Sequence, residues 1–258
     1  TRATTRSAPG NAVSARAASA APVPATAPTT VPPTTAAPAP PVLAFVGDSV
    51  PYLAAEAIAG KAAQTGFVPL NLALPNCDGA AGHPKLRLGY GEVIHEAEGC
   101  GQWVERWSVP LSQGRPAAFV LMLGQTTVLD RRVDDEWQGP CDAEFQAWYE
   151  PTVAARVEWL AANAPAPIYL AVTPWAAPAA VGIVPQDHLE RTNCLNTLYD
   201  RVRATHPDVR RLDVAAWLCP QGPETCAPVR SDGLHFSEEG AVQFATWVRG
   251  QLTRDGVL

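Results

Sequence analysis

Two short motifs near opposite ends of the chain contain the three residue types of a serine-based acyl-transfer site. The first is Gly47-Asp48-Ser49-Val50, and the second is Asp232-Gly233-Leu234-His235. A serine hydroxyl is almost fully protonated at neutral pH, so it attacks an acyl carbonyl only when a neighbouring base takes its proton. His235 can be that base, and Asp232, three residues earlier, can fix the tautomer of the imidazole. The motifs predict a nucleophile at Ser49, a general base at His235 and an orienting carboxylate at Asp232.

Each motif also has an ordinary structural interpretation. Gly-Asp-Ser is common in turns, Asp232 could cap a helix that begins near Ser237, and a single histidine is usually structural. The order of the motifs favours the catalytic interpretation. The serine follows the first predicted strand, the Asp-x-x-His motif precedes the last predicted helix, and α/β periodicity lies between them.

The elements that must position these residues alternate between strand and helix. An apolar run of strand length predicts a strand at 42–46, and further strands are predicted at 68–74, 117–123, 168–173 and 209–213. Helical spacing of apolar residues predicts helices at 51–58, 145–160, 189–204 and 238–252. This alternation is typical of an α/β fold with a parallel sheet covered on both faces. Ligands bind at the carboxyl ends of such strands, where the sequence places Ser49, Asn76, 124–127 and 173–175.

The first 41 residues differ in composition from the rest of the chain. Residues 1–41 are almost wholly Ala, Thr, Pro and Ser, so we interpret them as a flexible linker, followed by one domain at 42–258. All 25 acidic residues lie after the linker with 16 of the 19 Lys and Arg, which gives the domain a formal charge of −9. This charge argues against a nucleic-acid partner.

The sequence has no apolar run long enough to span a membrane and no signal-peptide segment or starting methionine. We therefore expect a processed form, or a piece of a larger protein whose Pro/Thr-rich linker follows a membrane anchor. A secreted enzyme with a flexible N-terminus is the alternative. We expect the isolated domain to be monomeric.

The six cysteines are an even number and are compatible with three disulfides, which would place the protein outside the cytoplasm. Cys77 with Cys100 would clamp a long loop, proximity favours Cys219 with Cys226, and elimination leaves Cys141 with Cys194. A zinc site at Cys77, His83, His95 and Cys100 is the alternative, but these separations match no compact ligand motif. We expect no metal and no cofactor.

Trp175 is the one of the eight tryptophans that we single out as a candidate for substrate binding. It follows Pro174 at the end of a predicted strand, where an aromatic ring could stack on a sugar. Packing in the core is the more common fate of such a residue.

Together these motifs resemble the SGNH (GDSL-type) hydrolase family, whose four sequence blocks would span residues 42–253. The resemblance implies a three-layer α/β/α sandwich and assigns the catalytic serine, aspartate and histidine to Ser49, Asp232 and His235. Two blocks depart from the family pattern. Asn76 replaces a glycine whose backbone N–H binds the oxyanion, and Gly124-Gln125-Thr126-Thr127 replaces Gly-x-Asn-Asp.

These departures concern the oxyanion hole. Asparagine tolerates a positive φ better than most residues, so the backbone donor at Asn76 could be kept. Gln125 or Thr126 could replace the missing asparagine donor. Loss of one such donor typically costs about 10² to 10³ in rate, or roughly 3–4 kcal/mol. We therefore expect slow intrinsic hydrolysis.

Weaker motifs narrow the resemblance to the extracytoplasmic SGNH domains fused to integral-membrane acyltransferase-three proteins of actinobacteria. They include the linker, Asn76-Cys77, Val128-Leu129-Asp130-Arg131, Leu218-Cys219-Pro220 and Arg230-Ser231 before Asp232. This resemblance implies an O-acyltransferase, most often an O-acetyltransferase, that receives an acyl group from a membrane domain and passes it to a cell-envelope glycan. A secreted carbohydrate or lipid esterase and a non-catalytic glycan-binding module are the alternatives.

Overall fold

The structure is a computed structural model that describes residues 38–78, 85–91, 93–95, 99–180 and 182–258. The folded unit covers Ala39–Leu258. Its strands are β1 Val42–Gly47, β2 Val68–Asn71, β3 Lys85–Arg87, β4 Val93–His95, β5 Ala118–Met122, β6 Asp130–Val133, β7 Glu136–Gln138, β8 Ile168–Ala171 and β9 Val209–Leu212. Its α-helices are α1 Ser49–Ile58, α2 Ala62–Thr65, α3 Trp103–Gln113, α4 Ala143–Asn163, α5 His188–Thr205, α6 Val214–Leu218 and α7 Glu238–Arg254, and its 3₁₀ helices are η1 Cys100–Gln102, η2 Pro178–Ala180 and η3 Pro223–Thr225. The predicted linker lies almost wholly outside the described residues.

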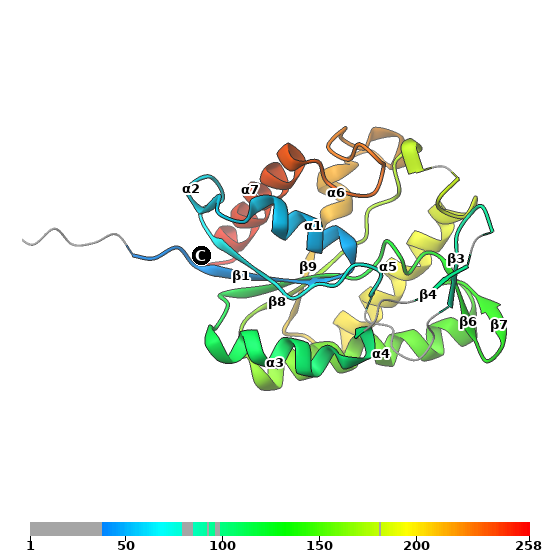
Figure 1. Ribbon diagram of the computed structural model, residues 1–258, viewed down its shortest axis with the longest axis horizontal. Coiled ribbons are helices and arrows are strands. Elements are labelled where there is room, and N and C mark those ends of the chain that lie inside the picture. Colours follow the sequence, from blue (N-terminus) through cyan, green and yellow to red (C-terminus); the bar gives the residue numbers. More distant parts are fainter. Residues whose placement is uncertain (1–37, 79–84, 92, 96–98, 181) are drawn as a thin grey trace, which may run out of the picture. The chain divides into compact units, whose positions relative to one another are not determined.

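Five parallel strands form the central sheet in the order β2-β1-β5-β8-β9. Alternate residues of β1 face opposite sides: Ala44 and Val46 pack with α3, α4 and α5, whereas Leu43 and Phe45 pack with α1, α6 and α7. Helices therefore cover both faces of the sheet (Figure 1). The α/β three-layer architecture expected from the sequence is confirmed.

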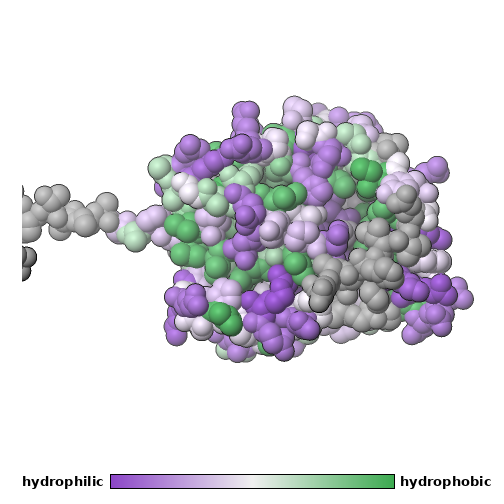
Figure 2. Space-filling view, viewed as in Figure 1, coloured by the Kyte–Doolittle hydropathy of each residue, from purple (hydrophilic) through white to green (hydrophobic). Residues whose placement is uncertain are grey.

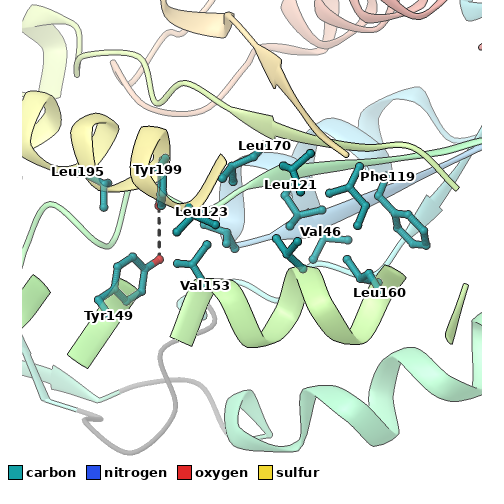
Figure 3. Close-up of a cluster of buried hydrophobic side chains, with 14 of the residues drawn as sticks. Val46, Phe119, Leu121, Leu123, Tyr149, Val153, Leu160, Leu170, Leu195 and Tyr199 are labelled. Carbon is teal, nitrogen blue, oxygen red and sulfur yellow. Dashed lines mark hydrogen bonds between the residues drawn. The ribbon is translucent and has the colours of Figure 1, made fainter. Parts of the chain in front are cut away.

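The core on the α4 side consists of apolar strand residues packed against one long helix. Val46, Leu121 and Leu170 face Val153 and Leu160 of α4 across this layer (Figure 3). Burial of each such side chain stabilises the fold by roughly 1.5–3 kcal/mol before the entropic cost of ordering it. At one end of the layer the hydroxyls of Tyr149 and Tyr199 lie 3.4 Å apart. The apolar core therefore ends at a pair of polar groups.

Strand β2 lies at the edge of the central sheet and carries Pro69. The N–H of Val68 donates to the carbonyl of Pro41, just before β1, and the N–H of Leu72 donates to Phe45 of β1. Because alternate residues of a strand point to opposite sides, the nitrogen of Pro69 faces away from the sheet. A proline at this position removes a donor that another strand could have paired with.

Hydrophilic and hydrophobic residues are interspersed over the described part of the face in Figure 2.

A second, antiparallel sheet was not expected from the sequence. Its strands have the order β4-β3-β6-β7, and we call it the annex sheet. Its four strands have only three or four residues each and contain charged side chains such as Lys85, Arg87 and Arg132. Such strands lack the apolar runs and regular alternation by which strands are recognised. The annex sheet comes from two insertions, one after β2 and one after β5.

Three disulfides join Cys77 to Cys100, Cys141 to Cys194 and Cys219 to Cys226. The expected pairing is confirmed, and the zinc alternative loses both of its cysteines. The side chains of His83 and His95 lie outside the described part of the structure. Disulfides are typical of proteins in oxidising compartments outside the cytoplasm. In the described segments, none of the helices combines the length and apolarity that a bilayer crossing needs.

Removal of the Cys141–Cys194 disulfide should destabilise the fold through the unfolded chain. The bridge closes a separation of 53 residues, for which the chain-entropy model gives about 4 kcal/mol. We expect the Cys141→Ala/Cys194→Ala variant to lose up to about this free energy of unfolding in urea titrations. With reductant in both samples the difference between variant and parent should vanish. Equal stability without reductant would contradict a constraining role for this bridge.

Candidate active site

The nucleophile turn joins β1 to α1 and brings Ser49 to the start of the helix. Gly47 ends the strand at a φ of 141°, and a Cβ there would lie 2.0 Å from the carbonyl oxygen of Met122 on β5. Only glycine allows this close approach of the two strands. Asp48 caps α1 by accepting the N–H of Val50 at 2.9 Å. The Gly-Asp-Ser motif thus combines a close backbone crossing, a helix cap and a partly exposed serine.

The structure brings together the three residues that the sequence predicted to act as a triad. Ser49 Oγ lies 2.7 Å from His235 Nε2, and His235 Nδ1 lies 2.6 Å from Asp232 Oδ2. Asp232 Oδ1 also accepts the backbone N–H groups of Leu234 and His235 at 2.8 and 2.7 Å. The carboxylate therefore fixes both its own turn and the ring of His235.

The electrostatics of Asp232 favour its ionised form. Partial burial would raise the pKa of this carboxyl, but the hydrogen bonds from the His235 ring and from two backbone N–H groups outweigh it and hold the pKa below its usual value. A charged Asp232 selects the tautomer in which Nδ1 of His235 carries the proton. Nε2 is then free to accept the proton of Ser49.

Asp48 is fully buried, and its carboxylate connects two loops of the site. Beyond capping α1 through Oδ1, it accepts the N–H groups of Gln125 and Thr126 through Oδ2 at 3.1 and 3.2 Å. Burial raises the pKa of Asp48, and the hydrogen bonds from Val50 and Thr126 oppose this shift. The nucleophile turn after β1 and the loop after β5 therefore share one anion. They meet between β1 and β5, where the strand order reverses and ligands of α/β sheets commonly bind.

Asn76 lies in the loop after β2 and adopts the left-handed conformation, with φ at 58°. The sequence-based expectation that asparagine could take the place of glycine here is consistent with this backbone. The neighbouring Cys77 is bonded to Cys100, which anchors the loop covalently. Whether the N–H of Asn76 stabilises an oxyanion stays a prediction.

A buried ionic network anchors the same loop two residues further on. Asp78 Oδ2 accepts hydrogen bonds from Arg131 Nη2 at 2.6 Å and from Thr127 Oγ1 at 2.8 Å. Its backbone carbonyl accepts the hydroxyl of Tyr149 at 3.2 Å, and burial raises the pKa of that hydroxyl, which keeps it protonated. The loop of Asn76 and the loop of Thr126 are thus tied together by one ion pair, which the sequence analysis did not identify.

The remaining candidates for substrate contacts are in the loops after β5 and β8. The side-chain amide of Gln125 donates to the carbonyl of Pro174 at 3.1 Å, so it holds the two loops together. Thr126 is half-buried, and its hydroxyl has a long contact of 3.4 Å with Asp48. Trp175 is half-buried, and its indole N–H donates to Asn193 at 3.2 Å. Their roles in substrate binding stay predictions, with Thr126 less committed to structure than Gln125.

Arg230 was named in the sequence analysis only as part of the motif before Asp232, and its structural role was missed. Its guanidinium is buried, and Nη2 donates to the carbonyl of Trp175 at 2.9 Å. Burial lowers the pKa of Arg230, and the charge of nearby Asp232 opposes this shift, so the pKa lies at about 10. The arginine therefore ties the loop after β8 to the turn that carries Asp232. The motif does not show that this arginine is buried.

A small cavity lies behind the nucleophile turn, next to Asp48, Gly124 and Thr173. It offers about 10 Å³ for the centre of a water molecule. This is close to the minimum for one water, so the cavity does not accommodate an acyl chain. An acyl group on Ser49 must lie on the open side of the turn.

Substitutions of Asn76 should distinguish a backbone donor from a side-chain donor. If the N–H of residue 76 stabilises the oxyanion, Asn76→Gly should keep turnover within a few-fold, because glycine adopts positive φ freely. Asn76→Val should lose far more, since a β-branched residue resists this conformation. Turnover of p-nitrophenyl acetate measures the effect. A loss of about 10² or more in the glycine variant would assign the donor to the side chain.

Comparisons with known proteins give a structural likeness only. No family model and no curated protein matches the sequence. Among solved structures, a GDSL-like lipase from Bacteroides thetaiotaomicron is 14% identical with a TM-score of 0.54, covering 83% of this chain and 88% of its own. A lipase/acylhydrolase from Enterococcus faecalis is 15% identical with a TM-score of 0.53, covering 82% of this chain and 95% of its own.

A carbohydrate esterase is also similar, at 12% identity and a TM-score of 0.53, covering 88% of this chain and 69% of its own. That protein is described as having an active site with divergent catalytic and non-catalytic binding functions. At these identities the likeness concerns the fold. The chain therefore has the α/β fold of GDSL-like lipases and acylhydrolases.

Proposed function

We propose that this domain is an O-acyltransferase of the SGNH type that works through an acyl-serine intermediate. The observation that carries the proposal is the continuous hydrogen-bonded chain from Ser49 Oγ through His235 to Asp232, with contacts of 2.7 and 2.6 Å. A serine, a histidine and a carboxylate in this arrangement are the groups that nucleophilic acyl transfer requires. The fold shared with acylhydrolases and a carbohydrate esterase supports the same chemistry.

In the first half-reaction, Ser49 Oγ attacks the acyl carbonyl of the donor while Nε2 of His235 takes the serine proton. The bond from Oγ to the acyl carbon forms, and the carbonyl oxygen becomes an oxyanion. The N–H of Asn76 and the hydroxyl of Thr126 are our candidates to stabilise it. The tetrahedral intermediate then expels the donor's leaving group, which receives the proton from His235, and acyl-Ser49 remains.

In the second half-reaction, a glycan hydroxyl attacks the acyl carbon and gives its proton to His235. The bond from the acyl carbon to Oγ breaks, and Ser49 recovers the proton. Asp232 stays ionised in both halves and stabilises the imidazolium that forms twice.

We further propose that the acyl donor comes from a membrane acyltransferase domain and that residues 1–41 are the tether to it. The Ala/Thr/Pro-rich composition of these residues supports this. The three disulfides support a location outside the cytoplasm.

Acylation should occur at Ser49. Incubation with an activated acetyl ester and peptide mapping by mass spectrometry should place the acetyl group on this residue. Ser49→Ala should abolish labelling and lower turnover by about 10⁴ or more while leaving thermal unfolding unchanged. Ser231→Ala, at the exposed serine beside Asp232, is the matched control and should label normally. Labelling of another residue would refute the assignment.

Transfer should exceed hydrolysis when a suitable glycan is present. The usual glycine and asparagine donors of the oxyanion hole are replaced here by Asn76 and Thr126, so we expect slow attack by water. A bound glycan positions its hydroxyl and gains a large effective concentration. Acetate and acetylated glycan should be quantified in one reaction, with several envelope polysaccharides as acceptors. Fast acetate release without an acceptor, and acetate as the only product with all of them, would favour the esterase.

A further inference from the structure

A groove of about 320 Å³ lies between the annex sheet and the loop that joins β8 to α5. Arg87, Asp130 and Arg191 contribute to it, Gln186 borders it from the β8–α5 loop, and the turn between β3 and β4 closes the annex side. Its volume falls in the range of about 300–1,000 Å³ that is typical of small-molecule sites. None of these residues belongs to the candidate triad.

The two walls of the groove are fixed to each other by a close backbone contact. Gly89, in the turn between β3 and β4, donates its N–H to the carbonyl of Ile183 at 2.8 Å. A Cβ at Gly89 would lie 2.1 Å from the carbonyl oxygen of Val184, so only glycine allows the turn to dock this closely. The turn between β3 and β4 and the β8–α5 loop are therefore held at a fixed separation across the groove.

The floor of the groove is one carboxylate held between two guanidinium groups. Asp130 forms ion pairs with Arg87 and Arg191, and its side chain is only 9% exposed. Burial would raise the pKa of Asp130, but hydrogen bonds from both arginines outweigh it and hold the pKa below its usual value. The guanidinium of Arg87 also lies 5.0 Å from the ring centroid of Trp137, which fixes it from a second direction.

The charges of the groove decide between classes of ligand. Arg191 also pairs at 2.8 Å with Asp187, which lies beside the groove lining, so the ion-paired cluster of two arginines and two aspartates has no net formal charge. A balanced set of donors and acceptors suits the hydroxyl groups of an uncharged sugar better than a polyanion. An acyl chain would find a polar lining in place of an apolar one.

The groove continues from the loops of the active site. Ala177 donates its N–H to the carbonyl of Gly233, within the turn between Asp232 and His235, at 2.9 Å. Six residues after Ala177 in the same loop, the N–H of Ile183 donates to the carbonyl of Ala180, and the carbonyl of Ile183 accepts the N–H of Gly89. The β8–α5 loop thus leads directly from the triad turn to the groove.

The loop after β5 provides a second connection between the groove and the candidate site. Asp130 follows Thr126 by four residues, and both belong to the segment that leaves β5. Two loops therefore connect the groove to the active site.

We infer that this groove is the acceptor subsite and that it binds an uncharged glycan chain through its hydroxyl groups. The inference rests on the proposed transferase function, since it assigns the acceptor of that reaction. A polymer bound here would extend along the β8–α5 loop toward Ser49, where one of its hydroxyls could receive the acyl group. The same binding would exclude water from the open side of the site.

A bulky substitution at the border of the groove can fill it without removing any of its ion pairs. Gln186 is exposed on the β8–α5 loop, so Gln186→Trp should obstruct the groove and leave the core intact. Gln113→Trp is the matched control, because this exposed residue ends α3 before the amino end of β5, whereas the candidate site lies at the carboxyl ends of the strands. Acetyl transfer from p-nitrophenyl acetate to hexamers of glucose, N-acetylglucosamine and mannose is measured for both, with a galacturonic acid hexamer as the charged comparison.

We expect Gln186→Trp to raise the KM of the preferred neutral hexamer about tenfold or more. Its p-nitrophenol release without acceptor should match that of the parent, and Gln113→Trp should behave as the parent in both assays. Binding of the same hexamers to Ser49→Ala by NMR titration provides a readout that needs no chemistry, and shifted resonances should map to the groove.

An unchanged KM in Gln186→Trp, binding of none of the three neutral hexamers, or tighter binding of the charged hexamer would overturn the inference. Failure to acylate Ser49 would instead refute the proposed function, and it would leave the binding measurement on Ser49→Ala interpretable. The two failures are therefore distinguishable.

Discussion

The carboxylate of Asp48 is the interaction on which the geometry of the candidate site depends. It is fully buried, and accepting N–H groups from α1 and from the loop after β5 only partly offsets the desolvation that raises its pKa. A carboxyl whose pKa is higher in the folded than in the unfolded state destabilises the fold when it is ionised at neutral pH. In return it fixes the direction of α1 and the position of Gln125 and Thr126 relative to Ser49. Without this carboxyl group, the nucleophile turn and the loop after β5 would lose the hydrogen bonds that join them beside Ser49.

Other contacts extend the same arrangement outward from Asp48. The Asp78–Arg131 ion pair holds the loop of Asn76, and Arg230 holds the loop of Trp175 against the triad turn. Each of these groups is buried and charged, which costs free energy unless its hydrogen bonds are well placed. Catalytic groups must be held within fractions of an ångström, and well-satisfied buried polar contacts make the loops that carry them more rigid. The buried charged groups around the site thus lower the stability of the fold, and in exchange they position loops that have no regular structure of their own.

Much of the fold could be predicted because its signals are local. The central strands β1, β5 and β8 are apolar runs, and α1, α4, α5 and α7 show regular apolar spacing, so these elements emerge from short windows of sequence. The helices α2, α3 and α6 were not predicted. The predicted strand 68–74 ends at Asn71 in the structure, although the N–H groups of Leu72 and Leu74 still donate to β1. The annex sheet was missed because its strands are short and charged, and because β3 pairs with β6 some forty residues away in the sequence.

The same distinction applies to the site. The residues of the candidate triad have recognisable types and spacing, whereas the supports of the site depend on contacts between distant segments. Asp48 was visible in its motif, but its bonds to Gln125 and Thr126 join positions 77 and 78 residues apart. The burial of Arg230 is a property of the folded molecule, and no single stretch of sequence encodes it.

The annex sheet has a consequence for how such a domain can diversify. It is made entirely from segments that leave β2 and β5 and return, while Ser49 is held by β1 and α1, and His235 by the turn that precedes α7. Arg131 of β6 must be kept, because its ion pair with Asp78 holds the loop of Asn76. Exchange of the other annex residues would alter the surroundings of the site without disturbing the strands and helices that hold its reacting groups.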